Sequence, residues 1–217
     1  EKSSFHVDET HYASQTIWKF YRSNYRTLRN QKLAEFLTEM GIATKIRFEL
    51  SGNGEVLFVY VKDMNNKDVS LGDLGRGAIQ LVLILMQMLN SVEDSFFEPY
   101  VDSDALTVAD KGIIIIEEPE QNLHPALQSK LADVFLNFHK NFIKNIIVET
   151  HSEYLVRRTQ VMVAKNEVKF KKNPFTVYYV PRNGIPYKMI YRKDGNFSNE
   201  FKPGFYDAAN NLLFEII

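Results

Sequence analysis

Hydrophobic and polar residues follow one another in two rhythms along the chain, and together they predict both helices and strands. Between Ser14 and Met40 apolar residues recur at helical spacing, with no Gly or Pro before Gly41. We therefore expect a helix that ends at Gly41. Strict alternation over Thr44–Leu50 and Glu55–Lys62, joined by a Ser-Gly-Asn-Gly turn, predicts a β-hairpin.

Two short, continuously apolar segments each end in polar residues and are followed by a helical pattern. Ile113–Ile116 leads into Glu117-Glu118-Pro119-Glu120, and Asn145–Val148 leads into Glu149-Thr150-His151-Ser152. Such runs are typical of strands that are buried on both faces of a parallel sheet. Two strand–turn–helix units in succession predict an α/β fold with a parallel sheet.

The segments that flank this core have patterns of their own. The glycine-rich stretch 70–77 opens an apolar helix over 78–90, and the acidic stretch 91–111 predicts a surface loop. Near the C-terminus two alternating runs around Asn183-Gly184 predict an antiparallel hairpin, and an amphipathic helix is expected over 206–217. We therefore expect a helical and hairpin segment (1–68), an α/β lobe (69–170) and a C-terminal hairpin and helix extension (171–217).

Composition and charge exclude several classes of protein. The 217 residues are 45% hydrophobic, and 26 Lys+Arg stand against 27 Asp+Glu, which excludes a globally basic nucleic-acid binder but not a local basic patch. No apolar run approaches the roughly 20 residues of a membrane span. The chain has no Cys, which fits a reducing interior and excludes thiol catalysis. We expect a cytoplasmic protein with no membrane partner.

Candidate chemistry lies at the ends of the two apolar strands. Ligands of parallel sheets bind beyond the carboxyl ends of the strands, so Glu117 and Glu118 from one strand and His151 from the other are expected to lie near each other. A carboxylate directly after four isoleucines is costly to desolvate unless it meets a cation, a hydrogen bond or water. Each cluster alone could be an ordinary strand end, but both together point to a functional site.

Three motifs in order carry a resemblance to ABC-type ATPases. Ile113–Glu120 resembles a Walker B strand with its catalytic glutamate, Leu123-His124-Pro125 lies where that family carries the D-loop, and Thr150-His151-Ser152 resembles the switch-histidine loop. The segment 73–80 resembles the signature of a prokaryotic AAA-type branch related to SMC and RecF proteins, and 202–207 resembles an element of its DUF3696-type members. The resemblance implies the C-terminal lobe of an ABC ATPase head, a P-loop NTPase fold.

The resemblance implies that the cofactors are ATP and Mg²⁺. Glu117, in the Walker B position, would hold Mg²⁺ through a coordinated water, because Mg²⁺ keeps several waters. Glu118 would orient or deprotonate the attacking water, and His151 would hydrogen-bond the γ-phosphate. Glu117 departs from the usual Walker B Asp, which lengthens the reach to the metal.

The resemblance also implies a homodimer joined through the ATP site. Gly75 and Gly77 would let backbone N–H groups at a helix start approach a phosphate that the other subunit holds. Arg76 stands where the signature has its first glycine, and His124 replaces the usual D-loop aspartate. We therefore expect these four residues to bind nucleotide.

The sequence lacks the phosphate-binding loop of such ATPases. No Gly-x-x-x-x-Gly-Lys-[Ser/Thr] occurs in it, and it begins at Glu1 instead of Met. We expect the chain to be the C-terminal portion of an ATPase, to pair with an N-terminal Walker A lobe of the same protein, and not to bind ATP tightly alone.

The expected function is ATP hydrolysis in DNA transactions or antiphage defence. One alternative is an ATPase–nuclease of the overcoming-lysogenization type, but acidic residues after His151 are sparse, so any nuclease is expected from a partner. The pair Asp102-x-Asp104 could indicate a metal-dependent nuclease, although an acidic loop explains it more simply. The other alternative is a non-catalytic binding module with a degenerate ATP site, against which Glu117, Glu118 and His151 argue.

Two basic regions leave nucleic-acid binding open. Four basic residues at helical spacing, interleaved with aromatic ones, could contact phosphates, although a solvated helix face is the favoured interpretation. A second basic region could bind nucleic acid or an acidic partner. The residues of the two regions are Lys19, Arg22, Arg26 and Arg29, and then Arg157, Arg158, Lys165, Lys169, Lys171 and Lys172.

Overall fold

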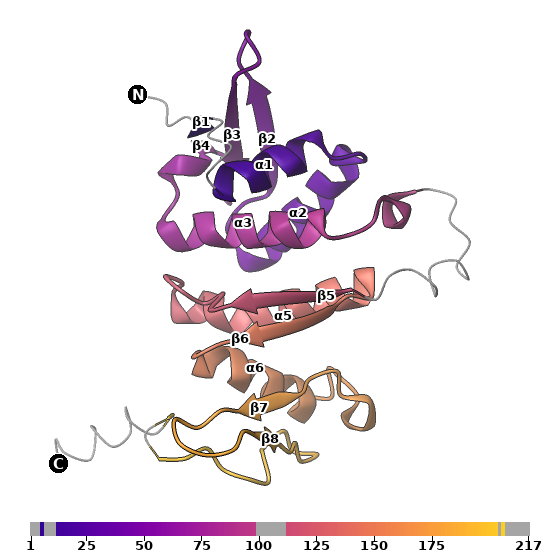
Figure 1. Cartoon of the computed structure of the whole chain (residues 1–217), viewed down its shortest axis with the longest axis vertical. Coiled ribbons are helices and arrows are strands. Elements are labelled where there is room, and N and C mark those ends of the chain that lie inside the picture. The colour runs from indigo at the N-terminus through magenta and orange to yellow at the C-terminus, as the bar shows by residue number, and fades with distance from the viewer. Residues whose placement is uncertain (1–4, 7–11, 99–111, 204, 207–217) are drawn as a thin grey trace, which may run out of the picture. The chain divides into compact units, whose positions relative to one another are not determined.

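The computed structural model describes residues 5–6, 12–98, 112–203 and 205–206. Internal contacts divide the chain into two units, Glu1–His151 and Ser152–Ile217. Helices, antiparallel strands and a parallel strand pair all occur, so the predicted α/β class is confirmed (Figure 1). The predicted division at 68/69 and 170/171 stays a prediction. Within the described part, no helix is long and apolar enough to cross a membrane.

The first unit contains an antiparallel sheet with the strand order β1-β3-β2, and β4 pairs with β3. The predicted hairpin is confirmed, because β2 and β3 pair in register from Lys45 opposite Lys62 to Leu50 opposite Leu57. Inward-facing side chains of β3, such as Val59 and Val61, are buried. The strands are β1 (Phe5–His6), β2 (Lys45–Leu50), β3 (Val56–Lys62) and β4 (Asp68–Ser70).

The described part of the first unit also contains four helices and two short 3₁₀ turns. Buried side chains from all four helices form its core, among them Phe20, Leu37, Leu85 and Phe138. The helices are α1 (Tyr12–Arg22), α2 (Arg26–Met40), α3 (Arg76–Asn90) and α5 (Pro125–Phe142), and the 3₁₀ turns are Leu71–Asp73 and Asp94–Phe97.

The prediction of a single helix from Ser14 to Met40 is wrong, because the helix is interrupted between α1 and α2. Tyr25 has φ 53°, a left-handed conformation that stops a helix without Gly or Pro. Its backbone carbonyl still accepts the first hydrogen bond of α2, from the N–H of Arg29 at 3.0 Å. Gly41, with φ 75°, ends α2 as the sequence predicts.

The parallel pair consists of β5 (Ile113–Glu117) and β6 (Asn145–Glu149), aligned so that Glu117 lies opposite Glu149. The helix α5, which joins the two strands, lies against one face of the pair (Figure 1). The strand–helix–strand unit that the sequence predicts is therefore present. It places the carboxyl ends of both strands at one edge.

The prediction that these strands are buried on both faces is wrong. Ile116 is 8% exposed on the face toward the core, whereas Ile113, Ile115 and Ile147 on the other face are 61%, 68% and 53% exposed. The reason is that no described part of the first unit covers that second face. We call these three side chains the open isoleucine face.

The second unit begins with α6 (Glu153–Ala164), whose N-cap Ser152 accepts a hydrogen bond from the backbone N–H of Leu155 at 3.2 Å. A 3₁₀ turn follows at Phe170–Lys172. The antiparallel pair β7 (Val177–Tyr179) and β8 (Tyr187–Met189) confirms the predicted C-terminal hairpin. The predicted helix over 206–217, Asp102-x-Asp104 and most of the predicted acidic loop lie outside the described residues.

Candidate active site

The first glutamate after β5 begins a strained turn. Glu118 has φ 44°, a conformation that costs a non-glycine residue about 1–2 kcal/mol. Its backbone N–H donates to the Glu149 carbonyl at 2.9 Å, which links the ends of β5 and β6. Strain of this kind is concentrated at functional sites. The strand ends at Glu117, and the change of backbone direction begins at the next residue, Glu118.

The side chains of Glu118 and His151 meet at this edge of the parallel pair. Glu118 Oε1 lies 3.5 Å from His151 Nε2, and Glu118 Oε2 accepts a hydrogen bond from Gln121 Nε2 at 2.8 Å. Both side chains of the pair are open to solvent, at 41% and 71% exposure. An ion pair this exposed contributes little to stability. The arrangement instead offers a carboxylate that water can reach, beside an imidazole.

A third glutamate, Glu120, is buried behind this pair. It is 8% exposed, and its Oε1 accepts a hydrogen bond from the backbone N–H of His151 at 2.6 Å. Its Oε2 has no hydrogen-bond partner among the described residues. Sequence reasoning assigned Glu120 no role. The available signal was a third carboxylate directly after Pro119, at a point where the chain leaves a buried strand.

Among the described residues, no hydrogen bond or ion pair joins the Glu117 side chain to the Glu118–His151 pair. It is exposed and in register with Glu149, which is also exposed. In the described part of the chain, no group of three or more His, Asp or Glu residues is placed to hold a metal. Mg²⁺ commonly uses one or two carboxylates and completes its coordination with water and phosphate oxygens. Glu117 fits that pattern, so the role predicted for it stays a prediction.

The start of α3 lies against the turn that follows Glu118. Gly77 is buried, and a Cβ atom there would lie 2.3 Å from the Asn122 carbonyl oxygen. Gln80 Oε1 also accepts a hydrogen bond from Asn122 Nδ2 at 3.4 Å. The predicted signature segment is therefore in direct contact with Asn122, the residue just before the predicted D-loop.

The other residues predicted to bind nucleotide have different surroundings. Gly75 is the exposed N-cap of α3, and a Cβ atom there would meet nothing within 4 Å. Arg76 is exposed and has no hydrogen bond or ion pair to a described residue. His124 caps α5, because its Nδ1 accepts from the Ala126 backbone N–H at 3.3 Å. Their nucleotide contacts remain predictions.

The two glycines give a matched pair of substitutions. We expect Gly77→Ala to force α3 away from Asn122, because backbone atoms there have little freedom to move, and to destabilise the chain by about 1–3 kcal/mol. Gly75 has φ −60°, which alanine adopts readily, and a Cβ atom there would meet open space. Gly75→Ala is therefore expected to change the free energy of unfolding by less than about 0.5 kcal/mol. Thermal unfolding of both variants measures the difference. Equal melting temperatures would show that the Gly77–Asn122 contact is not tight.

The two basic regions are less open than the sequence indicates. Arg22 and Arg26 are exposed but stack over Trp18 and Tyr21, each 4.6 Å from the ring centroid. In the second unit, Arg157 pairs with Glu153 at 3.0 Å and Arg158 pairs with Glu167 at 2.8 Å. Part of the charge in each region therefore already has a partner within the chain.

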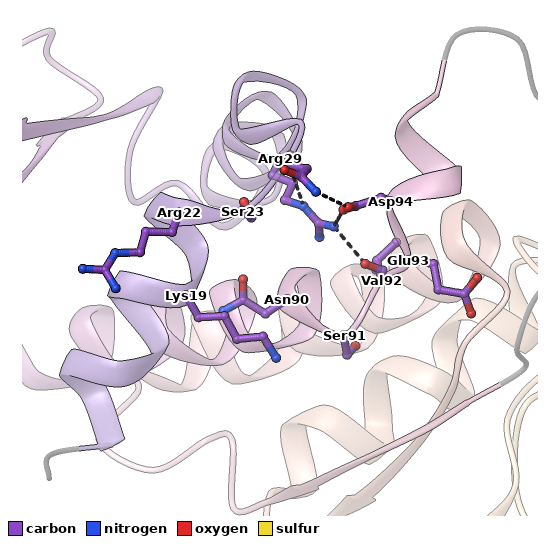
Figure 2. Close-up of a pocket in the computed structure, with 10 residues that line it drawn as sticks. Lys19, Arg22, Ser23, Arg29, Asn90, Ser91, Val92, Glu93 and Asp94 are labelled. Atoms are coloured by element: carbon purple, nitrogen blue, oxygen red, sulfur yellow. Dashed lines mark hydrogen bonds and ion pairs between the residues drawn. The ribbon is translucent and has the colours of Figure 1, made fainter. Parts of the chain in front are cut away.

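Arg29 does not belong to a solvated face, because it is buried and is one of the residues that line a hollow of about 550 Å³ (Figure 2). Its Nη2 donates to the Val92 carbonyl at 2.9 Å and to Asp94 Oδ1 at 2.7 Å. Hydrogen bonds from Asn24 and then Arg29 lower the pKa of Asp94. The contribution of this ion pair to folding stability is present at neutral pH, and it is lost only as the pH falls below the ordinary pKa of an Asp side chain. Arg29 therefore holds α2 to the segment after α3.

A family model for the AAA ATPase domain matches residues 7–156 of the chain. This range includes all seven residues that the sequence predicts for the site. No curated protein sequence matches the chain significantly. Membership of the DUF3696-type subgroup stays a prediction.

Several solved structures resemble the chain at low sequence identity. One, from work on ATP-driven dimerization and DNA-stimulated activation of SMC ATPases, is 12% identical with a TM-score of 0.49, over 94% of this chain and 96% of that one. The Smc head of Pyrococcus furiosus, bound to the C-terminal domain of ScpA, is 14% identical with a TM-score of 0.42, over 62% of this chain and 31% of that one. The Smc head of Pyrococcus yayanosii is 13% identical with a TM-score of 0.46, over 88% and 30%. All three TM-scores are below 0.5, so no conclusion rests on them.

Proposed function

Because the chain belongs to the AAA ATPase domain family, we propose that it supplies the Walker B and switch-histidine part of an ATP-hydrolysing site. The observation that carries this proposal is the contact between Glu118 and His151, whose side-chain atoms lie 3.5 Å apart at the ends of β5 and β6. The two residues are 33 positions apart in the sequence. The parallel strand pair brings them together.

Glu118 acts on the water that attacks the γ-phosphate. Its carboxylate is open to solvent and is oriented by Gln121, so it is able to accept a proton from a water molecule beside it. His151 donates from Nε2 to the γ-phosphate oxygens, next to that carboxylate. Glu117 holds Mg²⁺ through water. ATP, when bound, would supply the phosphoryl group, and Mg²⁺ would neutralise part of the phosphate charge.

The site is completed by two further surfaces. An N-terminal Walker A lobe of the same protein cradles the phosphates, since the chain has no P-loop motif of its own. The open isoleucine face supports this, because parallel sheets are covered on both faces. A second copy of the protein contributes Gly75, Arg76 and Gly77 to the nucleotide, giving a head-to-head homodimer. The exposure of Gly75 and Arg76 supports that part of the proposal.

We place the hydrolysis cycle in DNA transactions or antiphage defence in the cytoplasm, which is the setting that the resemblance implies. The exposed side chains of Lys19, Arg22 and Arg26 are available for contacts with DNA phosphates. A nuclease activity, if the pathway needs one, comes from a partner, since acidic residues after His151 are sparse. A degenerate, non-catalytic site is disfavoured, because the strained turn still places Glu118 beside His151.

The experiment that tests this function compares ATP turnover by the 217-residue chain alone with turnover by the chain joined to the proposed Walker A lobe. We expect turnover only when both parts are present. Hydrolysis at the same rate by the chain alone would overturn the proposal that its site is incomplete.

A further inference from the structure

We propose that Glu120 is a positioning residue for the ATPase site: its buried carboxylate holds the backbone of His151 so that the imidazole stays beside Glu118. This inference rests on the proposed function. Its structural part, the hold on the His151 backbone, is measurable without any ATPase activity. Neither the family match nor the sequence motifs assign Glu120 this role.

Three contacts join the turn after β5 to the last residue of β6 and to His151, which follows it. The Glu118 backbone N–H donates to the Glu149 carbonyl at 2.9 Å. In the opposite direction, the His151 backbone N–H donates to Glu120 Oε1 at 2.6 Å. The third contact is the side-chain pair of Glu118 and His151. Of these three contacts, only the one from Glu120 joins a side chain to the backbone of His151.

The turn itself is rigid enough to transmit this hold. The Gln121 backbone N–H donates to the Glu118 carbonyl and the Leu123 backbone N–H donates to the Glu120 carbonyl, both at 3.0 Å. These bonds fix the position of the Glu120 Cα relative to Glu118. Because the carboxylate of Glu120 is buried, few other rotamers are open to it.

Burial of this carboxylate carries a penalty that its contacts do not remove. Glu120 is 8% exposed, and its Oε2 has no hydrogen-bond partner among the described residues. An ionisable group that is buried and only half satisfied is unfavourable for folding. The hydrogen bond that fixes the His151 backbone is what the site gains from Glu120.

Hydrogen exchange of the His151 amide tests the structural part in the 217-residue chain. We expect Glu120→Ala to speed exchange of this amide at least about tenfold, because its acceptor is removed. Glu120→Gln keeps an acceptor oxygen at the same reach, so exchange is expected to stay within about threefold of the unsubstituted chain. The control is Glu39→Ala, which removes an exposed carboxylate from the same unit. Unchanged exchange in Glu120→Ala would overturn the proposal.

Steady-state kinetics of the chain joined to the Walker A lobe test the catalytic part. We expect Glu120→Ala to lower kcat about tenfold to a hundredfold with KM for ATP nearly unchanged, since a misplaced His151 acts mainly in the transition state. Glu120→Gln is expected to restore most of kcat, which loss of folding alone would not explain. Full activity of Glu120→Ala would overturn the positioning role, whereas an inactive unsubstituted protein would count against the proposed function instead.

Discussion

Replacing Glu118 by Gln in the assembled ATPase is expected to lower the turnover of ATP by about a hundredfold to ten-thousandfold, while ATP still binds. Gln has nearly the shape of Glu but cannot accept the proton of the attacking water. It retains an acceptor oxygen toward Gln121, so the turn should keep its form. Hydrolysis would therefore stop after ATP has brought two copies together.

Turnover and oligomeric state measure this prediction together. We expect Glu118→Gln to give a dimer that persists in ATP, seen by size-exclusion chromatography with light scattering. Glu35→Gln is the control, because Glu35 is an exposed glutamate whose ion pair with Lys32 lies on the surface of α2. Unchanged turnover in Glu118→Gln would contradict the role proposed for this carboxylate.

Replacing Ile115 by Lys is expected to prevent the chain from associating with the Walker A lobe. Ile115 is 68% exposed in the chain alone, so Lys is tolerated there and the melting temperature of the chain should hardly change. In the sheet that the proposed Walker A lobe would complete, the same position would be covered. The variant would lose about 1.5–3 kcal/mol of the binding free energy that burial of the isoleucine side chain provides, and it would also have to bury a charge. Association should weaken by at least about a hundredfold.

Binding of the separately expressed lobe to the chain, measured by calorimetry, checks this result. The control is Met64→Lys, since Met64 is an apolar residue with 49% exposure in the turn between β3 and β4. It should bind the lobe as the unsubstituted chain does. If Ile115→Lys also binds normally, the open isoleucine face is not where the lobe attaches.

The strand patterns were sufficient to predict the parallel pair and both hairpins. The hairpins depend on local alternation and turn residues, and the parallel pair depends on two short apolar runs that are each followed by a helical pattern. The break at Tyr25 was not predictable in this way. Tyr25 has no special preference for a positive φ, and Arg29 near the start of α2 bonds to Val92 and Asp94, which lie far along the chain. Periodicity alone carries no information about such distant contacts.

The candidate site was predictable only in part, because the sequence pattern locates the strand ends but not the side-chain contacts between the turns. The meeting of Glu118 and His151 follows from parallel strands that end at one edge, and the contact between their side chains is present. The bond from His151 to Glu120 was not predictable, because it depends on how a side chain crosses between two turns. The open isoleucine face was missed because an apolar run does not tell whether this chain or another part covers it.

Steady-state hydrolysis of MgATP by the chain alone, by the Walker A lobe alone and by the two joined is the most direct measurement of what the chain does. We expect hydrolysis only in the joined protein, and we expect it to disappear when EDTA removes Mg²⁺. The joined protein would then need both the phosphate-binding loop and the Glu118–His151 pair. If the Walker A lobe alone hydrolyses ATP as fast as the joined protein, this chain does not supply the catalytic groups.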